Sequence, residues 1–129
     1  TPASKTEADP ACTEAFVRKF APALLRRPIG DAEVRLRVDV AGTAADSMND
    51  FYAGLEVALS SLLVAPDFLF RVEVADPDPA APGRLRLTDV SLASRLSYLF
   101  WNSGPDEELR AAAERGDLSD PALLAAQVD

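Results

Sequence analysis

Proline placement is the strongest constraint on what this chain can fold into. The chain has ten prolines in 129 residues, and a proline inside a helix removes a backbone hydrogen bond and clashes with the preceding turn. Pro28 and Pro66 each follow an apolar segment with helical spacing, whereas Pro105 and Pro121 each stand at the beginning of one. The sequence therefore favours a series of short helices.

The segment before Pro28 has apolar residues at four-residue spacing, which predicts an amphipathic helix. These residues are Phe16, Phe20 and Leu24. We expect this helix to be interrupted or kinked near Pro22 and to stop before Pro28. Arg26 and Arg27 would lie in its last turn, where positive charge is favourable to the helix dipole.

Residues 33–40 fit two structures. Apolar and charged residues alternate there, as in a strand, but Val34, Val38 and Ala41 also share one face of a helix. A lone strand would have no neighbouring strand, so a helix is predicted. We expect residues 41–50 to form a loop.

The clearest helix is predicted from Phe51 to the residue before Pro66, with Asn49 or Asp50 as its cap. A short helix or extended turn would follow at 67–74. Residues 75–83 contain three prolines and predict an internal linker.

In the second half, Thr88 is the predicted cap of a helix that continues through "DVSLASRLSYLFWNS". Gly104 and Pro105 open the next helix, and Gly116 would end it in a left-handed conformation. Ser119 or Asp120 would cap a last helix over 121–129. The predicted fold is all-α, with about six short helices in two small lobes joined by the Pro-rich linker. Its parts are a flexible tail (1–10), an N-terminal helical module (11–74), the linker (75–84) and the start of a second helical module (85–129).

Composition narrows the functions that this chain can have. The net charge is -8, which disfavours nucleic acid and anionic membranes as partners. The sequence has no histidine and one cysteine, Cys12, so the usual general base, zinc and haem ligands and an internal disulfide are missing. The longest apolar run, 57–65, is far too short to span a membrane.

No pattern in the sequence indicates catalysis. It contains no nucleophile paired with a base, no set of metal ligands and no phosphate-binding glycine loop. Pairs of carboxylates stay possible anywhere among 21 acidic residues. We therefore expect no enzyme activity from this chain alone and no cofactor within it.

Several motifs in combination resemble a known architecture. They are Arg-Arg-Pro at 26–28, Pro-Asp-Phe-Leu-Phe-Arg-Val-Glu at 66–73, Ala-Ser-Arg-Leu-Ser-Tyr at 93–98, Trp101, and Pro-Asp at 105–106. With them, the chain resembles two consecutive modules of large exported bacterial proteins that are abundant in planctomycetes and myxobacteria. The modules are domain-of-unknown-function families 1595 and 1592.

The resemblance implies a periplasmic or extracellular location, and haem elsewhere in the parent protein, since such proteins often carry a c-type cytochrome domain. Cys12 would then form a disulfide to a segment outside this chain. The chain departs from the families at Gly30, where they have Thr or Ser, which weakens the following helix start. The second module normally continues beyond Asp129, and Thr1 is not preceded by a signal sequence. We therefore expect a processed product or an excerpt of a longer protein.

The helix through "ASRLSYLFW" is apolar around most of its circumference and would need cover on several sides. Its predicted role is contact with a partner. The residues assigned to this interface are Leu92, Leu96, Tyr98, Leu99, Phe100 and Trp101. Alternatively, the aromatic residues could stack on a sugar, a quinone or a haem.

Arg71, Glu73 and Arg95 are predicted to form structural ion pairs, with Arg95 paired to Glu73 or to a helix carboxyl end. The alternative for Arg71 and Glu73 is an anion or substrate site. Asp76 and Asp78 fit a solvated linker better than a calcium site. The acidic residues 106–108 suit the first turn of a helix.

The sequence thus favours a non-catalytic helical assembly or interaction module of a larger exported protein, with protein subunits or the rest of the parent as partners. The alternative is a segment of a c-type-cytochrome-linked oxidoreductase that lines a cofactor or substrate site held by other chains. An absorbance spectrum of the natural complex discriminates between the two.

Overall fold

A computed structural model describes residues 1–127 and divides the chain into two compact units, Thr1–Leu69 (unit 1) and Phe70–Asp129 (unit 2). The described residues contain seven α-helices and one small antiparallel sheet of two strands. The prediction of a mainly helical fold is confirmed.

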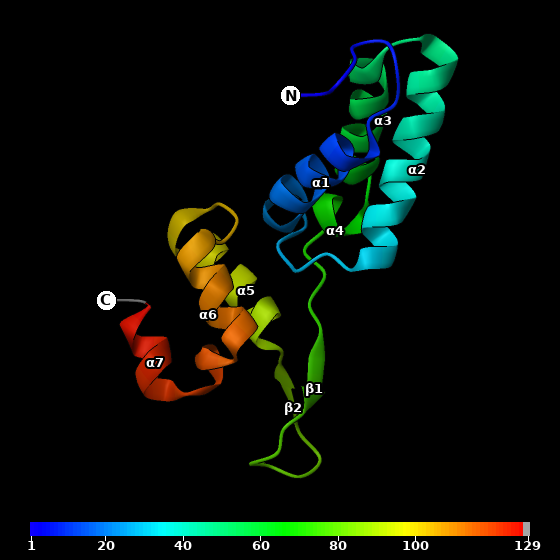
Figure 1. The fold of residues 1–129 in the computed structure, drawn as a ribbon. Coiled ribbons are helices and arrows are strands. Elements are labelled where there is room, and N and C mark those ends of the chain that lie inside the picture. Colours follow the sequence, from blue (N-terminus) through cyan, green and yellow to red (C-terminus); the bar gives the residue numbers. More distant parts are fainter. Residues whose placement is uncertain (128–129) are drawn as a thin grey trace. The chain divides into compact units, whose positions relative to one another are not determined.

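Unit 1 is a cluster of helices around one core. Its elements are α1 (Pro10–Leu25), α2 (Asp31–Met48), α3 (Phe51–Leu63) and α4 (Pro66–Leu69). Helices α2 and α3 lie side by side in opposite directions, and α1 packs against both (Figure 1). The buried core residues are Val17, Ala21, Leu25, Val34, Ala41, Ala58 and Leu62.

Helix α1 begins at a cap and ends before the two arginines. The Asp9 carboxylate accepts a hydrogen bond from the Cys12 amide at 2.9 Å, and the helix continues past Pro22 to Leu25. Arg26 adopts a left-handed conformation with φ of 56° and ends it. The prediction that Arg26 and Arg27 belong to the last turn is therefore wrong, because both side chains bind the α4 region instead.

Helix α2 confirms the choice of helix for residues 33–40, but the loop predicted at 41–50 is wrong because the helix continues to Met48. Ala41 and Ala45 are buried against α3, where Gly54 makes a close approach. A Cβ at Gly54 would lie 2.4 Å from the Ala41 carbonyl oxygen. This contact stabilises the second half of α2, and it cannot be recognised from the local sequence.

Local capping accounts for the boundaries of α2 and α3. Gly30 has no capping hydroxyl, and the Glu33 carboxylate accepts a hydrogen bond from the Gly30 amide at 3.2 Å. Asp50, one of the two predicted candidates, caps α3 by accepting a hydrogen bond from the Tyr52 amide at 2.8 Å. The segment predicted as a flexible tail lies against this region, since the Phe51 amide donates to the Lys5 carbonyl at 2.9 Å.

Unit 2 begins with an extended segment and a β-hairpin. Strand β1 (Ala75–Pro77) pairs with β2 (Leu85–Leu87), and Ala75 lies opposite Leu87. The Pro-rich stretch predicted as a linker therefore forms one arm and the tip of this hairpin. Gly83, at the tip, has a φ of 82° that only glycine adopts readily. The change from unit 1 to unit 2 falls earlier than the predicted linker, between Leu69 and Phe70.

The rest of unit 2 is helical. Its elements are α5 (Asp89–Trp101), α6 (Glu107–Arg115), a 3₁₀ turn η1 (Asp117–Ser119) and α7 (Pro121–Ala126). Thr88 caps α5 and Gly116 ends α6 with a φ of 82°, both as predicted. Val128 and Asp129, which the last predicted helix included, lie outside the described residues. The buried core consists of Ala93, Leu109, Ala112, Ala113 and Leu118.

Candidate functional site

Helix α5 buries its small residues and exposes its large ones. Ser91, Ala93 and Ser97 are buried, and Ala93 clusters with two alanines of α6. At the carboxyl end of the helix, the exposed fractions are 72% for Leu99, 51% for Phe100 and 55% for Trp101. Three of the six predicted interface residues therefore lie on the surface of unit 2, and Leu92, Leu96 and Tyr98 are half-buried.

The two exposed aromatic rings form a pair. The ring centroids of Phe100 and Trp101 are 5.9 Å apart, and the ring planes are tilted by 55°. Trp101 also borders a shallow hollow of about 160 Å³ with Asp106, Glu108 and Leu109. The exposed apolar surface thus has an acidic rim.

The three residues predicted to form ion pairs are brought together along α5. Arg95 donates two hydrogen bonds to the Glu73 carboxylate, from Nε to Oε1 at 3.0 Å and from Nη2 to Oε2 at 2.5 Å. The Arg71 guanidinium lies over the Tyr98 ring, 5.1 Å from its centroid. Glu73 is therefore hydrogen-bonded to Arg95, while Arg71 makes a cation–π contact.

The charges of this pair stabilise each other. The Arg95 guanidinium holds the pKa of the Glu73 carboxyl below its ordinary value, chiefly through their hydrogen bonds. The Glu73 carboxylate raises the pKa of Arg95 in the same way. Both side chains are substantially exposed, 55% for Arg95 and 38% for Glu73, so solvent screens the attraction.

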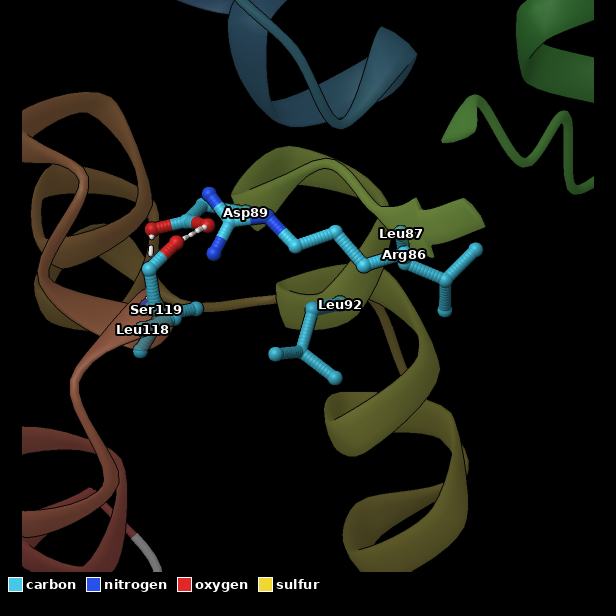
Figure 2. A pocket seen from close by; sticks show the side chains of 6 residues that line it. All are labelled: Arg86, Leu87, Asp89, Leu92, Leu118 and Ser119. Carbon is cyan, nitrogen blue, oxygen red and sulfur yellow. Dashed lines mark hydrogen bonds between the residues drawn. The ribbon is translucent and has the colours of Figure 1, made fainter. Parts of the chain in front are cut away.

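A second hollow, of about 270 Å³, lies where the hairpin meets the first turn of α5. Figure 2 shows the Asp89 carboxylate hydrogen-bonded to Ser119 within it. Asp89 accepts from the Ser119 hydroxyl at 2.5 Å and from its amide at 3.1 Å. Because this carboxylate binds both the hydroxyl and the amide, the bonds join η1 to the start of α5. The residues lining the hollow are Arg86, Leu87, Asp89, Leu92, Leu118 and Ser119.

Unit 1 contains an ion-pair network that the sequence reasoning missed. Arg27 donates to the Glu33 carboxylate at 2.9 and 3.0 Å and to the Asp67 carboxylate at 2.6 and 3.0 Å. The hydrogen bonds from Arg27 lower the pKa of Glu33 to about 2, and these bonds raise the pKa of Arg27. The network holds the beginnings of α2 and α4 near the end of α1. The two arginines before Pro28 were the sequence feature that could have indicated this network. They were instead predicted to interact with the helix dipole.

The remaining candidates have local roles. Cys12 is half-buried in the first turn of α1. Asp78 accepts a hydrogen bond from the Ala80 amide at 2.9 Å in the hairpin loop. Asp106 caps α6 by accepting from the Leu109 amide at 2.9 Å. Within residues 1–127, no three Cys, Asp or Glu side chains are grouped so as to hold a metal ion.

A search for membrane-spanning helices in the described part of the chain found none with the required length and apolar character.

Two protein families match this chain in succession. Residues 12–73 match PSD5, a protein of unknown function (DUF1595), and residues 87–129 match PSD4, a protein of unknown function (DUF1592). Searches of curated proteins and of solved structures gave no match.

Proposed function

Since this chain carries a DUF1595 domain followed by a DUF1592 domain, we propose that it is a non-catalytic helical assembly module of a larger protein. Its contact surface is the carboxyl end of α5. The observation that carries the proposal is the adjacent exposure of Leu99, Phe100 and Trp101. Aromatic side chains bury large apolar areas and commonly anchor protein interfaces.

The surroundings of this surface indicate the chemistry of its partner. Asp106, Glu107 and Glu108 follow Trp101 closely in the chain, and two of them line the hollow beside its ring. A partner that brings an apolar side chain together with a lysine or arginine would meet both features. We expect this partner to be a protein subunit or another part of the parent protein.

The location belongs to the same proposal. The resemblance to exported bacterial proteins supports a periplasmic or extracellular assembly, with haem elsewhere in the parent protein. Cys12 would form its disulfide with a segment outside this chain. Cell fractionation, followed by mass spectrometry under non-reducing conditions, tests both points.

Site-specific photocross-linking tests the contact surface. A benzophenone amino acid is placed at position 100 or 101 of the full-length protein in its native cells, and position 36 serves as control. Leu36 is also an exposed apolar residue, but it belongs to α2. We expect the same protein partner to be captured from positions 100 and 101 and not from 36.

Equal capture from all three positions, or none from 100 and 101, would contradict the proposed surface. The purified cross-linked complex also addresses the oxidoreductase alternative. A haem absorbance band that shifts when Trp101 is replaced by Ser would indicate a cofactor beside this surface.

A further inference from the structure

Within the segment Phe70–Val74, residues 70–73 belong to the first family match by sequence and to the second unit by structure. The DUF1595 match extends to residue 73, but the second structural unit already begins at Phe70. Helix α4 ends at Leu69, so the segment follows unit 1 directly. The last residues of the first family therefore pack with the helices of the second.

Apolar and charged side chains alternate along this segment. In an ordinary amphipathic strand the apolar side packs on the protein, whereas here the charged side contacts the neighbouring helix. The charged side chains of Arg71 and Glu73 contact α5 while they remain accessible to solvent, and the apolar Val72 and Val74 are exposed as well. Alternation with a period of two is the pattern of an extended chain. The side that binds the helix is therefore the charged side, and recognition here depends on polar chemistry.

Helix α5 presents a matching row of groups. Ser91, Arg95 and Tyr98 are separated by four and three residues, which places them along one side of a helix. The Ser91 hydroxyl oxygen accepts a hydrogen bond from the Val74 amide at 2.8 Å. The segment runs antiparallel to the helix, since Arg71 contacts Tyr98, Glu73 contacts Arg95 and Val74 contacts Ser91.

We propose that Ser91, Arg95 and Tyr98 form a binding site on α5 for an extended Arg-Val-Glu-Val segment of the same chain, whose first three residues are the last three of the DUF1595 match. The Tyr98 ring binds a cation, the Arg95 guanidinium binds a carboxylate, and Ser91 Oγ binds a main-chain amide. We call residues 70–74 the strap. The strap is part of unit 2. The last residues of the DUF1595 match therefore pack on a helix of the DUF1592 match.

The backbone of the strap is fixed at its carboxyl end by a second bond. The Thr88 amide donates to the Val74 carbonyl at 2.9 Å, so both polar backbone groups of Val74 are bound at the start of α5. Further along α5, the Glu73–Arg95 pair is solvent-exposed, and the exposed Arg71 lies over the half-buried Tyr98 ring. We therefore expect the strap to open locally, and more readily at high ionic strength.

Hydrogen exchange in the full-length chain tests the strap. Glu73→Arg and Arg95→Glu each replace the ion pair with like charges, and the double variant Glu73→Arg/Arg95→Glu restores opposite charges. We expect the Val74 and Thr88 amides to exchange up to about fivefold faster in each single variant. The double variant should return toward the rate of the original chain.

Arg115→Glu is the matched control, because it disrupts another exposed ion pair of unit 2, in which Arg115 and Asp117 are 2.7 Å apart. It should leave exchange at Val74 and Thr88 unchanged. Slow exchange at Ala112 in the α6 core shows that unit 2 stays folded. Unchanged exchange in both single variants, or a double variant no slower than either, would overturn the proposal.

These outcomes are independent of the proposed function. The strap experiment measures amide exchange within the full-length chain, whereas the cross-linking experiment measures contact with another protein. Either can fail while the other succeeds.

Discussion

The two units differ in the large side chains that they bury. Unit 1 fully buries Phe51 and Leu62, and its helices pack around a continuous apolar core. Three of the five buried core residues of unit 2 are alanines, while Phe100 and Trp101 are exposed. Burial of apolar area is the main favourable contribution to folding. The difference indicates that unit 1 is stabilised mainly by its core, and unit 2 more by caps, hydrogen bonds and the strap.

The largest expected effects come from the same truncation in each core. Leu62 and Leu118 are both almost completely buried, and replacing either with alanine should cost about 3 kcal/mol of unfolding free energy. Because unit 2 has the smaller core, we expect Leu118→Ala to unfold unit 2 while unit 1 stays folded. Leu62→Ala should leave unit 1 folded but less stable. Denaturant titration with hydrogen-exchange mass spectrometry measures the unfolding of each unit separately. If both units stay folded after their truncation, the proposed difference in stability between the units is wrong.

The contact between α2 and α3 provides the next effect. In Gly54→Ala the new Cβ would lie 2.8 Å from the Ala45 Cβ and nearer still to the Ala41 carbonyl oxygen. We expect a loss of about 2 kcal/mol in unit 1 by thermal or chemical unfolding. Gly42→Ala is the matched control, since its Cβ would lie 3.9 Å from the Ala8 Cβ. That substitution should stabilise α2 by about 0.5–1 kcal/mol.

Unit 2 should be sensitive to the loss of a single cap. The Thr88 hydroxyl oxygen accepts a hydrogen bond from the Ser91 amide at 3.3 Å, and Thr88→Ala should cost about 1 kcal/mol. Thr88→Ser keeps the hydroxyl and should cost much less. If the exchange rates of α5 amides are the same in both variants, capping does not contribute to the stability of this unit.

Acid should affect unit 1 through the Arg27 network. The pKa of Glu33 is about 2 in the folded chain and 4.5 ordinarily, so its contribution to stability is fully present above pH 4.5 and is lost as the pH falls toward 2. Wild type should therefore lose more stability than Glu33→Gln over this range. Urea unfolding of both proteins at several pH values, followed through unit 1, measures the difference. Parallel curves would show that the pair is not coupled to folding.

The smallest effect is expected at the exposed aromatic pair. Phe100→Ser and Trp101→Ser should each change the unfolding free energy of the isolated chain by less than about 0.5 kcal/mol. A larger loss, measured by chemical unfolding, would place these rings in the core of unit 2 and remove the contrast between the units.

Features that depend on neighbouring residues could be predicted from the sequence. The caps at Asp50 and Thr88 and the left-handed end at Gly116 require only residue types at fixed spacing. The second half of α2 could not be predicted, because the burial of Ala41 and Ala45 depends on Gly54 in another helix. The role of Arg27 likewise requires Asp67, 40 residues away.

The candidate surface shows the same limit. The apolar character of α5 indicated that this helix needs cover, but periodicity alone did not identify which side faces the core. The small residues Ala93 and Ser97 are buried, and Ala93 packs with two alanines of α6. The sequence predicted either Glu73 or a helix carboxyl end as the partner of Arg95. In the structure, Arg95 forms an ion pair with Glu73.

The direct passage from α4 into the strap constrains how these two families can be rearranged by gene recombination. A breakpoint between residues 73 and 87 would separate the family matches cleanly, but it would leave the strap with the upstream fragment. A DUF1592 domain moved in this way would need a new upstream sequence with its own arginine and glutamate at the right spacing. Breakpoints near Leu69 would transfer a complete unit, so shuffled genes should retain the Phe-Arg-Val-Glu motif with the downstream domain.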